Sequence, residues 1–291
     1  MQLPKGVNRG TSTYGLEYLD IEHPKARARI FLQGAQVTEF QATNQPPLLW
    51  LSPEEDFRPA KAIRGGVPIC WPWFGAHAAN AAAPAHGFAR TSLWHLEGVI
   101  SRDEGVTLTL SLPVAARPDW PHSAQLTLTV SISDHLGLAL TTHNLGDTDL
   151  VLSQALHSYF DVQDITQVQI TGLRGCRYDD QLLGEAGRGL LCAEGPLNVA
   201  GEVDRIVYPR QPIGVTTPTY DLALTTQGSA SAVIWNPWLD KSARLSHFPA
   251  DGYKSMLCVE TANCGADARV IGAGASHSLA VEYRQLSTGK N

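Results

Sequence analysis

The sequence predicts an all-β fold of stacked, mostly antiparallel sheets, and three observations support this prediction. Apolar and polar residues alternate along many segments, with the period of a half-buried strand. Helical periodicity is nearly absent, and Gly, Pro, Asn and Asp residues separate the alternating segments. A large β-sandwich is therefore the expected architecture.

The individual strands follow from the same alternation. Residues 106–112 place four apolar side chains on one face and hydroxyls on the other, residues 125–133 repeat the pattern, and residues 136–144 follow as a hairpin partner. Further strands are expected at 27–33, 149–160, 166–171, 219–226, 230–236, 255–261 and 277–285. The alanine-rich stretch 76–85 contains Pro84 together with Asn and His residues, which favours a surface loop over a helix.

Length and composition predict a single domain covering residues 1–291. No linker, repeat or change of composition marks a boundary. The net charge of −6 comes without a run of Lys or Arg, which argues against binding to nucleic acid or to an anionic membrane. No apolar stretch approaches the roughly 18 residues of a membrane span, and the N-terminal residues lack the apolar segment of a signal peptide. We expect a cytoplasmic monomer that binds a small molecule.

The cysteines predict neither disulfides nor a metal site. The five of them are scattered along the chain without a Cys-x-x-Cys pair. Free thiols are the ordinary state of such residues in intracellular proteins. We therefore expect no metal and no cofactor.

Four segments contain residues that simple connectors do not need. Each places a titratable or cationic side chain among apolar residues, which costs solvation free energy unless a partner or a ligand compensates. The first of them fits neither a helix nor a strand. The four are RGGVPICWPWFG at 64–75, AHGFAR at 85–90, ALHSYFD at 155–161 and YKSMLCVETAN at 253–263, and we expect them to form the walls of one pocket.

His157 and Glu260 each lie in an apolar run that predicts a buried strand. A buried carboxylate almost always has a partner, so Glu260 could reach solvent at a sheet edge, pair with an arginine or belong to a site. His157 could be a core histidine that donates to a backbone carbonyl, or a functional one. Tyr159 shares its strand face and could line a cleft or simply pack. Only the fold could bring His157 and Glu260 together.

Two arginines stand beside glycine turns. Arg64 precedes Gly65 and Gly66, whose missing Cβ atoms would let the backbone approach a ligand, and Arg90 follows Gly87. A guanidinium matches phosphate or carboxylate oxygens in bidentate fashion, so two of them suit a small anion. The alternative is that both are structural arginines paired with Asp or Glu residues.

Together these motifs resemble the aldose 1-epimerase superfamily, and specifically its glucose-6-phosphate 1-epimerase (hexose-6-phosphate mutarotase) branch. The resemblance rests on six motifs in the expected order, RGGVPICWPWFG, HGFAR, HSYF, DRIVY at 204–208, WNPW at 235–238 and YKSMLCVETAN. It implies a metal-free, galactose-mutarotase-like β-supersandwich with the sugar held in an open cleft on one sheet.

The resemblance also implies roles for individual residues. His157 and Glu260 become the catalytic pair, Arg64 and Arg90 a phosphate clamp, and His86 and Asp204 groups that contact the sugar. Asp204 could instead cap a turn or pair with Arg205. Trp71, Trp73 and Phe74 would form an apolar floor, whereas Trp235 and Trp238 are expected to be core and corner residues.

The anomer exchange that the resemblance implies needs one base and one acid. Exchange between α and β anomers opens the hemiacetal, which removes a proton from the C1 hydroxyl and delivers one to the ring oxygen. We expect Glu260 as a carboxylate to take the first proton and His157 as an imidazolium to give the second. The resemblance implies a phosphosugar as the substrate, held by its phosphate far from C1.

Three alternatives stay open at this level. A carbohydrate-binding protein without activity could use the same fold. A glycoside hydrolase or lyase usually has two carboxylates, whereas the pair here is His with Glu. A mutarotase for unphosphorylated aldoses would not need the two arginines. The sequence also departs from the family pattern at Ala85, His247 and Thr261, where Gln, Asp and Pro are expected, and these departures affect the rim of the sugar site.

Overall fold

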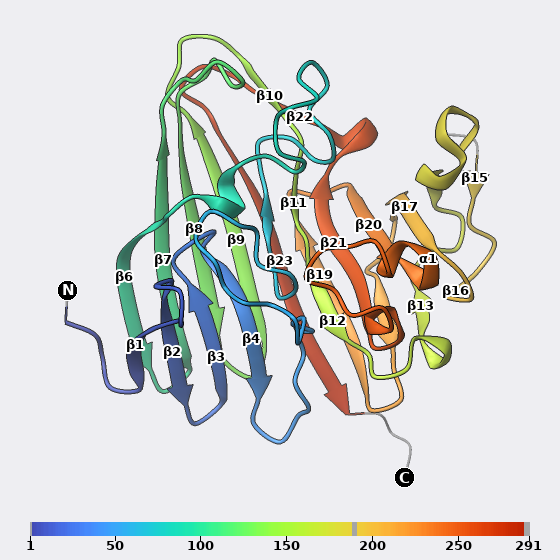
Figure 1. The fold of residues 1–291 in the computed structure, drawn as a ribbon, viewed down its shortest axis with the longest axis horizontal. Coiled ribbons are helices and arrows are strands. Elements are labelled where there is room, and N and C mark those ends of the chain that lie inside the picture. Colours follow the sequence, from blue (N-terminus) through green and yellow to red (C-terminus); the bar gives the residue numbers. More distant parts are fainter. Residues whose placement is uncertain (1, 188–190, 288–291) are drawn as a thin grey trace.

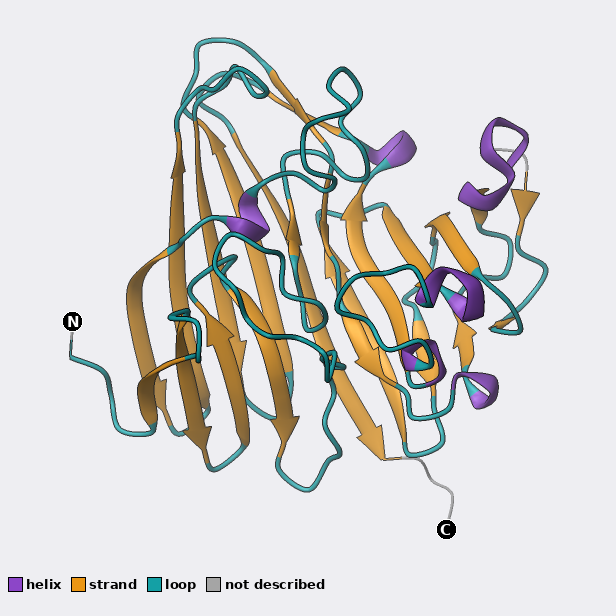
Figure 2. Ribbon diagram, in the orientation of Figure 1, coloured by secondary structure: helices purple, strands orange, loops and turns teal. Residues whose placement is uncertain are grey.

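The computed structural model describes residues 2–187 and 191–287, and these residues form a layered, almost entirely β structure (Figures 1 and 2). A nine-stranded sheet forms the long back layer. A four-stranded sheet packs on one half of it, and an eight-stranded sheet lies beside the four-stranded sheet, over the other half (Figure 1). Every pairing between two named strands is antiparallel in the described ranges. The predicted all-β class is confirmed.

The two large sheets join strands that are distant in the chain. From one edge to the other, the nine-stranded sheet contains β16 (Leu197–Asn198), β13 (Gln169–Thr171), β18 (Gly214–Thr216), β19 (Tyr220–Gln227), β23 (Ser276–Ser287), β9 (Leu136–Asn144), β8 (Ala124–Ile132), β7 (Gly105–Val114) and β6 (His95–Arg102). The eight-stranded sheet contains β15 (Leu191–Cys192), β14 (Arg177–Asp180), β17 (Val203–Tyr208), β20 (Ser231–Asn236), β21 (Met256–Asn263), β11 (Gln154–Leu156) and β5 (Ile69–Cys70), with β12 (Tyr159–Asp161) also paired to β21.

The remaining elements are short or peripheral. The four-stranded sheet contains β1 (Val7–Thr11), β2 (Glu17–His23), β3 (Ala26–Phe31) and β4 (Gln36–Ala42), and a separate pair joins β10 (Leu150–Leu152) to β22 (Arg269–Ile271). Helices in the described residues are α1 (Trp238–Ser242) and the 3-10 turns η1 (Ala89–Thr91), η2 (Ile165–Gln167), η3 (Gln181–Gly187), η4 (Gly252–Lys254) and η5 (Gly265–Asp267). None of these helices is long and apolar enough to cross a membrane.

Strict alternation builds the core between the layers. In β7, the side chains of Val106, Leu108, Leu110 and Leu112 are buried, while the hydroxyl residues between them face outward. The neighbouring strands β8 and β9 repeat this pattern in register. The predictions for 106–112, 125–133 and 136–144 are therefore confirmed to within two residues, because in a half-buried sheet the sequence period is the structural period.

Two predicted strands were wrong in detail. Residues 149–160 form three short strands rather than one, because the backbone N–H of Ser153 donates to the Pro72 oxygen and that of Ser158 turns back to the Leu156 oxygen of its own segment. Residues 166–171 begin as the turn η2, since the Asp164 carboxylate accepts from the backbone N–H of Thr166 and caps it. The loop prediction for 76–85 is confirmed, whereas the stretch 64–77 does contain the two-residue strand β5.

Strand β21 of the eight-stranded sheet is buried on both faces, and one of these faces carries the candidate site. Along β21, Leu257 and Val259 face the main core, while Met256, Cys258 and Ala262 belong to a second apolar cluster on the opposite face. Alternation places Glu260 on this second face. A carboxylate is thereby held in the middle of a fully buried strand.

Gly66 is essential to the segment that carries Arg64. Its φ is +64°, and a Cβ built on it would lie 2.3 Å from the carbonyl oxygen of Val37. The glycine thus allows close packing on β4, rather than the close approach to a ligand that the sequence suggests. Gly66→Ala is expected to lower the free energy of unfolding by more than about 2 kcal/mol, from backbone strain and overpacking together.

The matched control for this prediction is Gly15→Ala. Gly15 also has a positive φ, of 90°, but no atom lies within 4 Å of the point that a Cβ would occupy. Chemical denaturation of both variants should show the larger loss for Gly66→Ala. Equal losses would mean that backbone conformation alone, without the contact to Val37, determines the effect.

Candidate active site

A cavity of about 740 Å³ opens on the second face of the eight-stranded sheet, a size suited to a small ligand. All six residues predicted from the sequence line it, and these are Arg64, His86, Arg90, His157, Asp204 and Glu260. Each of the four segments expected to form pocket walls contributes to the lining. The fold thus brings together residues that are far apart in the chain.

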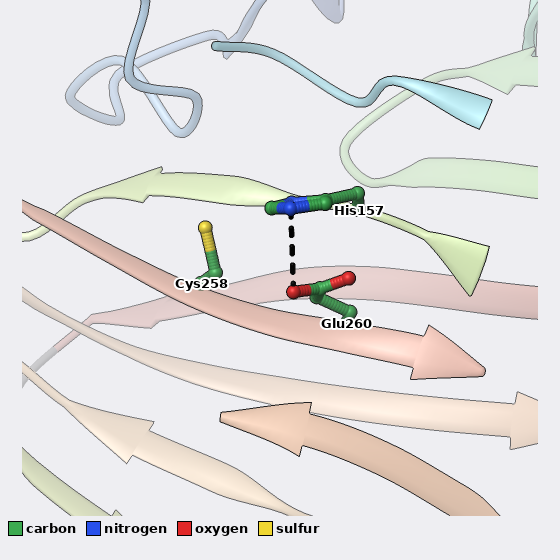
Figure 3. A group of neighbouring side chains, drawn as sticks. All are labelled: His157, Cys258 and Glu260. Atoms are coloured by element: carbon green, nitrogen blue, oxygen red, sulfur yellow. Dashed lines mark ion pairs between the residues drawn. The ribbon is translucent and has the colours of Figure 1, made fainter. Parts of the chain in front are cut away.

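His157 and Glu260 meet because of strand register. Leu156 pairs with Thr261 and Tyr159 with Cys258, so the same register puts His157 directly opposite Glu260. Opposite residues of an antiparallel pair share a face and lie close together. The His157 Nε2 and Glu260 Oε1 atoms are 3.5 Å apart, and both side chains are almost completely buried (Figure 3). Neither the edge-of-sheet position nor the arginine partner considered for Glu260 is observed.

Both members of this pair have a free polar atom. The Nδ1 atom of His157 and the Oε2 atom of Glu260 are buried and have no hydrogen-bond partner among the described residues. The Tyr159 ring stacks on the imidazole with centroids 4.8 Å apart and planes 7° apart, which fixes the orientation of His157. Buried polar atoms normally have partners, and His157 and Glu260 both line the cavity, so these two atoms are available to a ligand there.

Burial and nearby charges favour the neutral forms of the pair. Desolvation by burial lowers the pKa of His157 well below its usual value, and His86 and the guanidiniums of Arg90 and Arg64 lower it further. Burial raises the pKa of Glu260 well above its usual value, and the carboxylate of Asp204 adds to this. The imidazolium expected at His157 in the reaction is therefore disfavoured while the site contains no substrate. A neutral imidazole with a protonated carboxyl carries the same single proton as the ion pair.

The two arginines lack carboxylate partners. Arg64 Nη1 donates to the Tyr159 hydroxyl at 3.4 Å, and Arg90 Nη2 donates to the backbone oxygen of Ala85 at 2.7 Å. Neither guanidinium forms an ion pair with an Asp or Glu within the described residues, although both line the cavity. The alternative of two structural, carboxylate-paired arginines is thereby contradicted. Both guanidiniums therefore line the cavity without a carboxylate partner in the part of the chain that the structure describes.

His86 is held as a neutral hydrogen-bond donor. Its Nδ1 accepts from the backbone N–H of Gly75 at 3.2 Å, which leaves the ring proton on Nε2. Burial and the charges of Arg90 and Arg64 lower the pKa of His86 to about 3. The residue has a φ of +63°, a conformation that non-glycine residues adopt only where the surroundings enforce it.

Asp204 pairs with a lysine that no sequence motif identified. Lys241 Nζ lies 3.4 Å from Asp204 Oδ2 and 2.9 Å from Glu202 Oε1, and Lys241 itself lines the cavity. The alternative pairing of Asp204 with Arg205 is not observed, since Arg205 binds Asp180 at 3.1 Å. Burial raises the pKa of Asp204, and Lys241 opposes this rise.

The aromatic residues divide differently from the prediction. Trp71 and Trp73 lie in the main core, with their indole N–H groups donating to Thr142 Oγ1 and the Pro84 oxygen, so they do not form a floor. Phe74 does line the cavity, and Trp235 is the buried core residue that was expected and also lines the cavity. The Trp235 ring meets those of His157 and Tyr159 edge-on, with centroids 6.0 and 6.1 Å away.

The three departures from the family pattern lie in different places. Ala85 lines the cavity and offers its backbone oxygen to Arg90. His247 does not line it, and its Nδ1 lies 3.8 Å from Asp56. Thr261 is buried on the opposite face of β21 from Glu260. Of the three, only Ala85 is in a position to alter the rim of the cavity.

Comparison with known proteins identifies the family of this chain. The family model for aldose 1-epimerase matches residues 17–284. A curated Salmonella typhimurium protein named "Putative glucose-6-phosphate 1-epimerase" is 35% identical over 84% of this chain and 83% of its own length, and an Escherichia coli protein of the same name is 34% identical over 85% and 83%. A Salmonella typhimurium crystal structure, described as a "putative mutarotase", superposes with a TM-score of 0.90 at 29% identity and covers 99% of this chain and 96% of its own. The protein belongs to the aldose 1-epimerase family and has the galactose mutarotase-like fold of that family.

Proposed function

We propose that this member of the aldose 1-epimerase family interconverts the α and β anomers of hexose 6-phosphates, with glucose 6-phosphate as the first substrate to test. The observation that carries the proposal is one cavity lined by two contrasting sets of residues. A buried His–Glu pair lies 3.5 Å apart in it, and two guanidiniums without carboxylate partners line the same space. The names of the curated relatives agree with this substrate class.

His157 and Glu260 carry the proton transfers. The two oxygens that exchange protons, O1 and O5, are both bonded to C1, so the acid and the base must lie close together, as these side chains do. Glu260 takes the proton from the O1 hydroxyl while His157 Nε2 gives one to O5, the C1–O5 bond breaks and the aldehyde forms. After rotation about the C1–C2 bond, O5 attacks the other face of the aldehyde. His157 then recovers its proton from O5, and Glu260 returns one to O1.

Arg64 and Arg90 hold the phosphate at the far end. Remote binding energy of this kind orients the reacting centre without taking part in the chemistry. The phosphate also changes the charge of the site, because its two negative charges offset the guanidiniums that disfavour a protonated His157. The proton of the pair then moves from Glu260 to His157, which gives the carboxylate and imidazolium that the reaction starts from. His86 and Asp204 contact the sugar hydroxyls.

Phosphate binding is therefore expected to raise the pKa of His157. In the phosphate-free protein, the ring should stay neutral to a pH well below the usual value of about 6.5. Inorganic phosphate should move the titration upward, because a dianion between the guanidiniums stabilises the imidazolium. NMR titration of the ring resonances, with and without phosphate, measures this shift. An identical titration in both conditions would contradict the predicted effect of phosphate on the pKa of His157.

The substrate class is tested by NMR exchange between anomers. We expect fast exchange on glucose 6-phosphate, slow exchange on glucose, and loss of both with His157→Ala. Equal rates on the two sugars would contradict the phosphate clamp and leave a mutarotase of free aldoses. Binding of the phosphosugar without any exchange would instead identify a carbohydrate-binding protein.

A further inference from the structure

We propose that Cys258, together with His157 and Glu260, forms a binding site for a thiophilic divalent cation such as Zn²⁺, and that the bound ion blocks the active site. The sequence alone predicts no metal site, because these residues are distant or unremarkable in the chain. The inhibitory part rests on the proposed function, whereas binding of the ion does not. The three side chains are shown together in Figure 3.

The donor atoms already lie close to the geometry of a tetrahedral site. The ligand atoms of His157, Cys258 and Glu260 all lie within 4.8 Å of one another, and the His157 Nε2 to Glu260 Oε1 distance is 3.5 Å. With bonds of about 2.0 to 2.3 Å, neighbouring ligand atoms around zinc are roughly 3.3 to 3.6 Å apart. The nitrogen and oxygen therefore need no rearrangement, and the thiol needs a shift of about 1 Å at most.

An unpaired carboxylate oxygen supplies a second observation. Glu260 is 1% exposed, and its Oε2 atom has no hydrogen-bond partner in the part of the chain that the structure describes. Strand alternation places Cys258 on the same face of β21 as Glu260. A cation between His157 Nε2 and Glu260 Oε1 would occupy the position of the shared proton, and bidentate binding by the carboxylate would satisfy Oε2 as well.

The donor set selects the kind of ion. A thiolate with an imidazole and a carboxylate favours zinc or cadmium over magnesium or calcium, which prefer oxygen ligands alone. The thiolate and the carboxylate together balance the two positive charges of the ion, which offsets the repulsion from Arg64 and Arg90. His157 and Glu260 line the cavity, so the ion enters there and keeps a fourth position open toward it. An ion held this way would prevent His157 and Glu260 from transferring protons.

Cobalt(II) is the probe for the site, because thiolate ligation gives it a strong near-ultraviolet absorption. Metal-free protein titrated with Co²⁺ should gain this absorption at one ion per chain, and Zn²⁺ should abolish it. Cys258→Ser should lose the absorption, whereas the control Cys192→Ser, which removes an exposed thiol, should keep it. Absorption that persists in Cys258→Ser would overturn the proposal, as would no binding by the unmodified protein. Thermal melting establishes that each variant is folded.

Enzyme assays test the inhibition separately. Zn²⁺ should suppress anomer exchange, and a chelator should restore it. Loss of a direct ligand should weaken inhibition by more than the roughly 10-fold that even an outer partner contributes, so Cys258→Ser should remain active at zinc concentrations that inhibit Cys192→Ser. If Cys258→Ser does not fold, Glu260→Gln retains the thiol and should still bind Co²⁺ at least about tenfold more weakly. If the protein exchanges no sugar anomers, the proposed function fails while the cobalt spectrum still decides the metal site.

Discussion

Glu260→Gln is expected to slow anomer exchange on glucose 6-phosphate by about 10²- to 10⁴-fold, the usual contribution of a positioned acid or base. Glutamine has nearly the same shape but cannot accept the O1 proton. His157→Ala should lose a similar factor, because the ring oxygen then lacks its proton donor. The two groups share one proton across 3.5 Å, so they act as a unit and the double variant should be no slower than the worse single one.

The control for these variants is His143→Ala, on the outer side of β9, where the imidazole hydrogen-bonds to Ser276 and does not line the cavity. It should retain the exchange rate of the unmodified protein. Rates are measured by magnetisation transfer between the two anomeric protons. If Glu260→Gln or His157→Ala kept the full rate, the pair would be structural and the chemistry would have to lie elsewhere.

Removal of the guanidiniums is expected to change the substrate preference. Arg64→Met and Arg90→Met should each raise KM for glucose 6-phosphate by roughly 10- to 100-fold, which corresponds to about 1.5 to 3 kcal/mol for a hydrogen bond to a charged group. Methionine keeps much of the packing of the arginine stem. Neither arginine has a carboxylate partner that would be left unpaired, so the fold should tolerate the change.

Exchange on unphosphorylated glucose should not be slowed by the same substitutions, because glucose has no phosphate contact to lose and the removed guanidiniums disfavour the imidazolium form of His157. Arg205→Gln is the matched control, since Arg205 pairs with Asp180 and does not line the cavity. It should leave KM for glucose 6-phosphate unchanged. Equal losses on both sugars in the Arg64 and Arg90 variants would show that the arginines support the cavity wall rather than bind phosphate.

The fold could be predicted where one face of a strand is buried and the other is wet. Strands β7, β8 and β9 are of this kind, and their bounds were predicted closely. The N-terminal strands β1 and β2 were missed, because β1 is mostly exposed and Leu19 and Ile21 are the only fully buried apolar side chains of β2. Residues 149–160 were predicted as one strand because no local pattern records their breaks, where the N–H groups of Ser153 and Ser158 donate to the Pro72 and Leu156 oxygens. The prediction of one domain over residues 1–291 stays a prediction.

The residues of the cavity were predicted from motifs, but their geometry was not. His157 lies opposite Glu260 because of the register between their strands. The sequence shows neither which strands pair nor in which register. The same holds for Cys258, Trp235 and Lys241, whose contacts depend on neighbours distant in the chain. The lowered pKa of His157 was not predicted either, because burial and the nearby arginines act through space.

The most direct test is a crystal structure with a glucose 6-phosphate analogue that lacks the O1 hydroxyl and therefore cannot open its ring. The proposed mechanism predicts O5 within about 2.6 to 3.2 Å of His157 Nε2, and phosphate oxygens at the same distance from both guanidiniums. A sugar bound with its phosphate away from Arg64 and Arg90, or with O5 turned away from His157, would contradict it.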